Sequence, residues 1–166
     1  MQFANEVLIL VGTMSGTAEM VADSMADELE EQGIAARIVR MENARPSQVA
    51  SASHVIVCTS TYGKGEVPDN AKALLAALKE ERPKLDSLLY GVFSLGSSAH
   101  KRTFCFGGRH FDEMLVELGA TRLGEHFQQD DRGGVPADEA GDEWISRWIE
   151  AANRNSGKPD NAGVET

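Results

Sequence analysis

Apolar runs alternate along this chain with segments in which apolar residues recur every three or four positions. Val7–Val11 is a continuous apolar run, typical of a strand buried on both faces. The next segment predicts a helix, because its apolar residues lie on one helical face: Ala18, Val21, Ala22, Met25, Ala26 and Leu29. We expect this helix to end near Gly33. The chain therefore opens with a buried strand and an amphipathic helix.

The same alternation continues through most of the sequence. Further strands are predicted at residues 35–40, 54–58, 89–95 and 122–127. Helices are predicted at 68–81, 105–118 and 138–152, and the last of them buries Trp144, Ile145, Trp148 and Ile149. Five strands alternating with helices predict an α/β fold, a doubly wound parallel sheet with helices on both faces. Ligands bind such sheets at the carboxyl ends of the strands, so the loops there are the candidate site.

Length and composition fit one domain, which we place at residues 1–152 of the 166. Residues 153–166 are poor in apolar side chains, and we expect a disordered tail. The start at Met1 and this tail favour a complete chain over a fragment of a longer diflavin enzyme. No apolar run is long enough for a membrane span and the first residues do not form a signal peptide, so the cytoplasm is the expected location.

The net charge of −10 argues against a nucleic-acid partner and suits a protein that meets basic partner surfaces. The two cysteines, Cys58 and Cys105, form neither a disulfide framework nor a zinc site. The four histidines are scattered, and we therefore predict no metal.

The loop after the first strand carries the clearest chemical signal. Residues 12–19 combine two glycines and three hydroxyl side chains immediately before a helix. Backbone N–H groups, hydroxyls and the positive end of a helix dipole together bind a phosphate. The loop has no Lys or Arg and no Gly-Lys-Ser/Thr ending, so a single phosphomonoester fits better than a nucleoside triphosphate. An ordinary capped turn remains the alternative.

Three more loops lie at the same edge of the predicted sheet. After the third strand, Tyr62 is followed closely by Gly63 and Gly65, which suits stacking on a planar ring with close backbone approach. A turn with a half-buried tyrosine is the alternative there. Residues 96–105 form a polar loop that is able to wrap the other side of a ligand. Residues 128–134 form an acidic turn, for which a solvated loop is the alternative.

These motifs resemble the flavodoxin family. Residues 13–19 resemble its phosphate loop, residues 61–66 with 68–71 its Thr-Tyr-Gly segment, and residues 93–97 its third flavin loop, especially as found in the FMN domains of diflavin reductases. In size and in residues 103–105 the chain is similar to short MioC-type proteins. The resemblance implies a five-stranded flavodoxin-like sheet of order 2-1-3-4-5 and one bound FMN.

The resemblance also implies the residues that would bind FMN. Residues 13–18 would cradle the phosphate, Tyr62 would stack on the ring, and Gly63 would offer its peptide group to flavin N5. His100 stands where the family often has a second stacking tyrosine. The full set implied is Thr13, Met14, Ser15, Gly16, Thr17, Ala18, Thr61, Tyr62, Gly63, Lys64, Gly65, Leu95, Gly96, Ser97, His100, Phe104, Cys105, Gln129 and Asp130.

The function implied is that of a monomeric FMN-dependent electron carrier rather than an independent enzyme. It would work between an NAD(P)H-dependent flavodoxin reductase and a downstream redox enzyme. Two alternatives remain open at this point. One is a flavin-dependent NAD(P)H quinone or nitro reductase, and the other is a flavodoxin-like binding or regulatory module without a cofactor.

Overall fold

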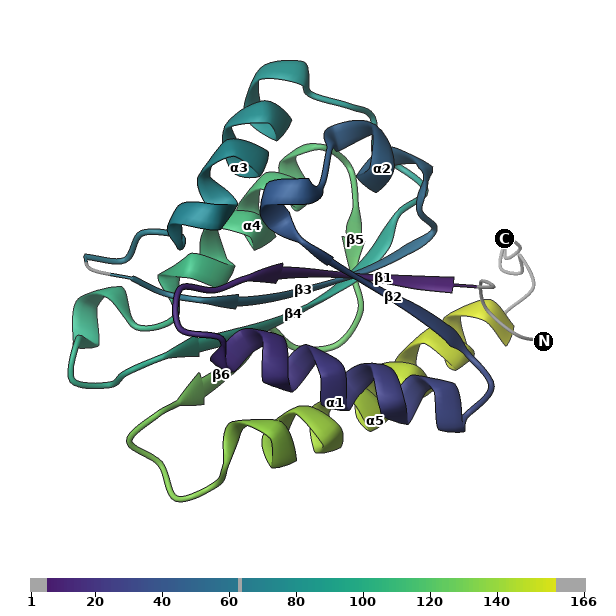
Figure 1. Ribbon diagram of the computed structural model, residues 1–166. Helices are drawn as coiled ribbons and strands as arrows, with labels where there is room; N and C mark the ends of the chain where they lie inside the picture. The colour runs from purple at the N-terminus through teal and green to yellow at the C-terminus, as the bar shows by residue number, and fades with distance from the viewer. Residues whose placement is uncertain (1–5, 63, 158–166) are drawn as a thin grey trace.

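The computed structural model describes residues 6–62 and 64–157 (Figure 1). Its strands form one parallel sheet in the order β2-β1-β3-β4-β5, which confirms the predicted topology. The four long strands lie close to their predicted positions: β1 (Glu6–Gly12), β2 (Ala35–Arg40), β3 (His54–Ser60) and β4 (Leu89–Gly96). β1 and β3 are buried on both faces, as their apolar runs predict.

The fifth strand differs from the prediction of one strand at residues 122–127. Two short strands, β5 (Thr121–Arg122) and β6 (Phe127–Asp130), pair separately with β4. Residues 123–126 between them lie opposite only Gly91 and Val92 of β4. The edge strand therefore has more residues than β4 at this point, and its pairing with β4 is interrupted. Gly124 there has a φ of +74°, which an extended strand does not allow.

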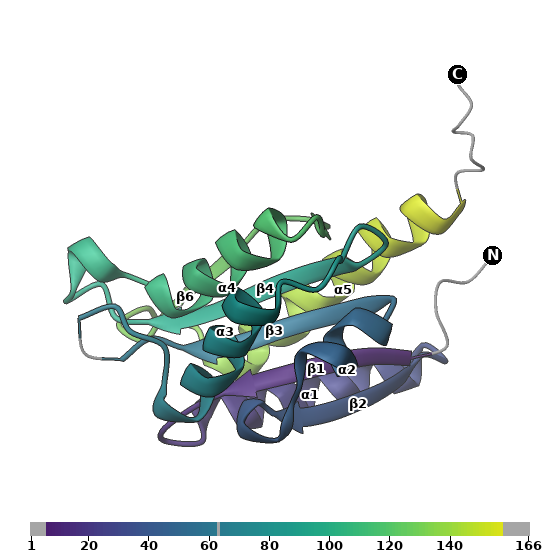
Figure 2. The same ribbon diagram turned by 90° about the horizontal axis from the view of Figure 1, so that it is seen from above.

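Helices cover both faces of the sheet (Figures 1 and 2). Against one face pack α1 (Thr17–Glu31) and α5 (Ala137–Gly157). Against the other pack α3 (Asp69–Glu81), α4 (Phe106–Glu117) and the short α2 (Pro46–Ser51). The sequence did not predict α2 or the 3₁₀ turns η1 (Met41–Asn43) and η2 (Lys101–Thr103), because such short segments carry no periodic signal.

The final helix is longer than predicted. It continues to Gly157 and so includes residues 153–157 of the segment expected to be a disordered tail. The rest of that segment, residues 158–166, lies outside the described residues. Within the described ranges, none of the helices combines the length and the apolar character that a membrane crossing requires.

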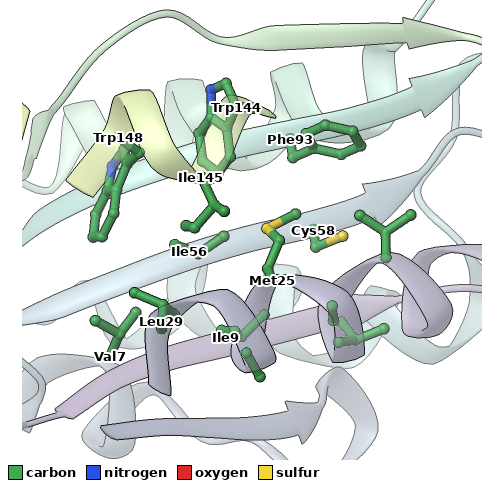
Figure 3. Close-up of a cluster of buried hydrophobic side chains, with 14 of the residues drawn as sticks. Val7, Ile9, Met25, Leu29, Ile56, Cys58, Phe93, Trp144, Ile145 and Trp148 are labelled. Carbon is green, nitrogen blue, oxygen red and sulfur yellow. The ribbon is translucent and has the colours of Figure 1, made fainter. Parts of the chain in front are cut away.

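Aromatic packing between α5 and the sheet fixes the core beneath α1 and α5 (Figure 3). Trp144 and Trp148 are buried with their ring centroids 6.4 Å apart, and Phe93 of β4 lies 5.8 Å from Trp144. Ile145 and Ile149 are also buried, which confirms the predicted inward face of the helix. Gly91 of β4 leaves room for both indoles, because a methyl group there would overlap Trp148 and lie 2.8 Å from Trp144 Cη2.

We therefore predict that Gly91→Ala lowers the free energy of unfolding by about 2 kcal/mol, because an added methyl group forces two large rings out of position. Gly134→Ala is the control, since a methyl group there meets nothing within 4 Å and the residue has an ordinary φ. Urea denaturation of both variants measures the difference. Equal stabilities would contradict this account of the aromatic packing.

Candidate functional site

A pocket of about 420 Å³ opens at the carboxyl edge of the sheet, where the sequence places the candidate loops. The loops after β1, β3, β4 and β6 all contribute to it. Nine of its lining residues belong to the predicted set: Met14, Ser15, Thr17, Thr61, Tyr62, Leu95, Gly96, Ser97 and His100. The structure thus brings together residues that are far apart along the chain.

The loop after β1 leads directly into α1. Gly16 precedes the helix with a φ of +96°, a left-handed conformation that favours glycine. The buried side chain of Thr13 holds the turn, because its Oγ1 accepts the Gly16 N–H at 2.9 Å. The first N–H groups of any α-helix lack partners within the helix, so those of Thr17 and its neighbour remain for a ligand. The loop offers neutral donors at a helix N-terminus, which suits an anion.

Asn70, at the start of α3, anchors this loop from outside. Its Oδ1 accepts the Thr13 N–H at 2.9 Å, and its Nδ2 donates to the Val11 carbonyl at 3.3 Å. The same Nδ2 group donates to Glu42 Oε1 at 2.7 Å, and this hydrogen bond lowers the pKa of Glu42. One amide thus connects the end of β1, the loop and the η1 turn. Asn70 is a positioning residue that the predicted site did not include.

The loop after β3 is closed by a short antiparallel bridge. Tyr62 and Glu66 exchange two backbone hydrogen bonds of 2.8 Å, and the Tyr62 side chain lines the pocket while 50% exposed. Two contacts from α4 hold the loop: Gly107 N–H donates to Thr61 Oγ1, and His110 Nε2 donates to the Gly65 carbonyl, both at 2.9 Å. Gly63, which was expected to meet flavin N5, lies outside the described residues.

The loop after β4 forms the opposite wall. Leu95, Gly96, Ser97 and His100 line the pocket there, with Thr103 of η2. Cys105 is buried behind this wall, and burial raises the pKa of its thiol to about 12. Its backbone passes so close to Gly96 that a methyl group on that glycine would lie 2.9 Å from the Cys105 nitrogen. Cys105 therefore shapes the wall and is not a reactive thiol.

Several predicted residues lie around the pocket without lining it. Gln129 donates from Nε2 to the Val135 carbonyl at 2.9 Å. Asp130 Oδ1 accepts the N–H groups of Ser98 and Arg132 at 2.9 and 3.0 Å, and these bonds lower the pKa of its carboxyl. The remaining described residues of this kind support the loops or lie at their surface: Thr13, Gly16, Ala18, Lys64, Gly65, Phe104 and Cys105.

Three lining residues were absent from the predicted set: Ser60, Thr103 and Asp131. Ser60 is the last residue of β3, and the predicted strand ended two residues earlier. Asp131 belongs to the turn for which a solvated loop was an alternative. The carboxylate of its neighbour Asp130 accepts backbone N–H groups of the loops, whereas Asp131 lines the pocket.

Comparisons with known proteins agree with this geometry. Residues 9–144 match the family model described as Flavodoxin. The chain is 32% identical over 155 residues to the NADPH sulfite reductase flavoprotein alpha-component of Bacillus subtilis, covering 93% of this chain and 25% of that protein. It is 36% identical over 142 residues to the Vibrio parahaemolyticus protein of the same name, covering 85% and 22%. The chain thus spans about a quarter of the length of these curated relatives.

Solved flavodoxin structures match this chain along nearly their whole length. A mutant of flavodoxin from Pseudomonas aeruginosa is 30% identical, with a TM-score of 0.80. The alignment covers 89% of this chain and 98% of that one. A flavodoxin from Streptococcus pneumoniae TIGR4 is 26% identical with a TM-score of 0.77, and the alignment covers 87% and 98%.

We predict that Asn70→Ala lowers the free energy of unfolding at neutral pH by about 2 kcal/mol, because it leaves the Thr13 N–H and the Val11 carbonyl without their partner. The matched control is Asn153→Ala, which removes an exposed asparagine on α5. Urea denaturation and hydrogen exchange at the Thr13 amide are the measurements. An unchanged exchange rate at Thr13 would rule out the anchoring role.

The destabilisation by Asn70→Ala should also depend on pH. A lowered pKa in the folded state means that the Glu42 carboxylate stabilises the fold above its unfolded pKa of about 4.5. That contribution is lost as the pH falls through the lower, folded pKa. The difference in stability between wild type and variant should therefore be smaller at pH 3 than at pH 7. A difference that grows on acidification would contradict the Asn70–Glu42 coupling.

Proposed function

Because the chain belongs to the flavodoxin family and is an FMN-dependent electron carrier of that type, we propose that the pocket at the carboxyl edge of the sheet holds the FMN. The observation that carries this proposal is the uncharged loop at the start of α1, beside a pocket with a half-exposed tyrosine. The FMN supplies the redox chemistry when it is bound. The protein supplies binding, orientation and exclusion of water.

The donor set of the loop suits one phosphomonoester. Ser15 and Thr17 place hydroxyl groups at the pocket, and their Oγ atoms lie 3.3 Å apart. The helix N-terminus adds N–H donors and a partial positive charge. Residues 13–18 contain no Lys or Arg, so hydrogen bonds and the dipole, rather than an ion pair, would hold the phosphate. The pocket volume of about 420 Å³ lies within the range of small-molecule and cofactor sites.

The flat part of the cofactor would lie between the second and third loops. Tyr62 lines the pocket from one side, and Leu95, Ser97 and His100 line it from the loop after β4. We assign Tyr62 to one face of the ring, because an aromatic side chain gains most from stacking on another planar ring. Gln129 and Asp130 would act indirectly, by fixing the loops that carry Ser98 and Val135.

The partners proposed are an NAD(P)H-dependent flavodoxin reductase, which would reduce the bound FMN, and a redox enzyme that would accept the electrons. Support comes from the relatives, which are flavoprotein components of an NADPH sulfite reductase. The monomeric state and the cytoplasmic location remain predictions from the sequence.

The double substitution Ser15→Ala with Thr17→Val should weaken FMN binding at least tenfold and leave riboflavin binding unchanged. Each hydroxyl removed costs a charge-assisted hydrogen bond to phosphate, worth roughly 1.5–3 kcal/mol, and about 1.4 kcal/mol is a tenfold change. Quenching of flavin fluorescence measures both affinities. The control is Ser87→Ala, at an exposed serine in the turn before β4. Equal losses for FMN and riboflavin would contradict the assignment of this loop to the phosphate.

We expect the FMN-loaded protein alone to show no steady oxidation of NADPH, with or without an added quinone. Hydride transfer needs the nicotinamide against the flavin ring, where Tyr62 is proposed to lie. A catalytic amount of an FAD-containing, flavodoxin-reducing NADPH reductase should start rapid reduction of the bound FMN, followed by absorbance. Steady NADPH turnover by the chain alone would favour a quinone or nitro reductase instead.

A further inference from the structure

Charge at the pocket has the opposite balance to charge in the whole chain. The segments between strand and helix at this edge are residues 13–16, 61–68, 97–105 and 131–136. They contain four cationic residues, Lys64, Lys101, Arg102 and Arg132, but only two acidic ones, Glu66 and Asp131. The whole chain has 16 Lys and Arg against 26 Asp and Glu. The acidic excess therefore lies elsewhere on the molecule.

We consider the three cations on the loops after β3 and β4, since Arg132 follows Asp130 and Asp131 directly in the chain. Lys64, Lys101 and Arg102 are exposed, and within residues 6–62 and 64–157 no carboxylate lies within 4.0 Å of their charged nitrogens. Several cations elsewhere do form ion pairs: Arg122 pairs with Asp112 at 2.6 Å, and Arg82 pairs with Glu117 at 2.8 Å. The three charges at the pocket are therefore not neutralised by the described part of the chain.

Their positions follow from the loop structure. Lys101 and Arg102 form the η2 turn, directly between the lining residues His100 and Thr103. Lys64 lies in the tight turn that the Tyr62–Glu66 bridge closes. We call Lys64, Lys101 and Arg102 the basic rim. Loops after the neighbouring strands β3 and β4 carry its members, and these loops meet, because a methyl group on Gly65 would lie 2.9 Å from Thr103 Cβ.

The carboxylates nearest this mouth are partly occupied. Asp69 pairs with Lys72 at 3.1 Å, and Asp130 accepts two backbone N–H groups. Asp131 and Glu66 remain as local negative charges. At physiological ionic strength the Debye length is about 8 Å, so a partner at the pocket responds to these local charges more than to distant helices.

We propose that the basic rim receives an acidic surface of the electron-transfer partner, a patch of Asp and Glu beside that partner's own redox centre. This inference rests on the proposed function and refines it. It reverses the expectation from net charge alone, under which the protein would meet a basic surface. Complementary charge at the rim would raise the rate of encounter and orient the two redox centres.

Two small one-electron oxidants of opposite charge test the sign of the local field. FMN-loaded protein is reduced with dithionite and mixed in a stopped-flow instrument with hexacyanoferrate(III), charge 3−, or with tris(phenanthroline)cobalt(III), charge 3+. Each complex takes one electron from the reduced flavin. Ionic strength is raised from about 0.1 M to about 1 M, over which the Debye length shrinks from about 10 to about 3 Å, so that charges far from the mouth are screened throughout.

Variants are compared with wild type, because the phosphate of bound FMN adds the same negative charge to each of them. At the lowest ionic strength, Lys101→Glu with Arg102→Glu should slow oxidation by hexacyanoferrate(III) by roughly threefold or more and accelerate oxidation by the cobalt complex, and both differences should vanish near 1 M. The control, Lys79→Glu with Lys84→Glu, changes net charge equally at the far end of α3 and just after it, and should leave both rates unchanged.

The outcomes separate the two proposals. FMN-loaded protein whose two oxidation rates are unaffected by Lys101→Glu with Arg102→Glu would overturn the basic rim and leave the electron carrier intact. Equal shifts of the rates in both double variants would also overturn the basic rim and leave the electron carrier intact, because net charge would then be the cause. A chain that binds no FMN, seen as unchanged flavin absorbance after gel filtration, would overturn the proposed function and the rim's role with it.

Discussion

Burial of the sheet on both faces is the constraint on which this structure depends. The long strands can exclude water only when helices cover them from both sides, and the two hydrophobic layers do so. The helices that cover the faces also connect successive strands, so the strands are parallel and every loop that follows a strand emerges at one edge. Four loops, far apart along the chain, are forced together there, and the pocket is the result.

Side chains outside the pocket hold these four loops in a defined shape. Asn70 fixes the first loop, while Thr61 and His110 connect the second to α4. Asp130 uses its carboxylate on backbone N–H groups and so orders the last loop. These contacts are polar and directional, in contrast to the apolar packing beneath them. The pocket can therefore be altered at single positions without changing the sheet.

The sequence patterns were sufficient for the elements and for most of the pocket, and the sheet order came from the resemblance to the flavodoxin family. Continuous apolar runs and one-sided helices identify the elements, and the motifs around Thr17, Tyr62 and Gly96 identify three loops. The interrupted edge strand was not predictable from apolar pattern alone. It follows from Gly124 and from the contact of His126 Nε2 with Ser94 Oγ at 2.5 Å, which joins residues distant in the chain. The supporting role of Gln129 likewise depends on Val135, which no local pattern indicates.

The central claim is that uncharged donors at the start of α1 hold the phosphate of FMN. ³¹P NMR of the FMN-loaded protein between pH 5 and pH 8 tests it most directly, because a free phosphomonoester titrates with a pKa of about 6. Hydrogen bonds to the dianion stabilise the charged form, so the account predicts a single resonance whose shift is constant over this range. A resonance that moves with pH as free FMN does would place the phosphate in water and contradict the account.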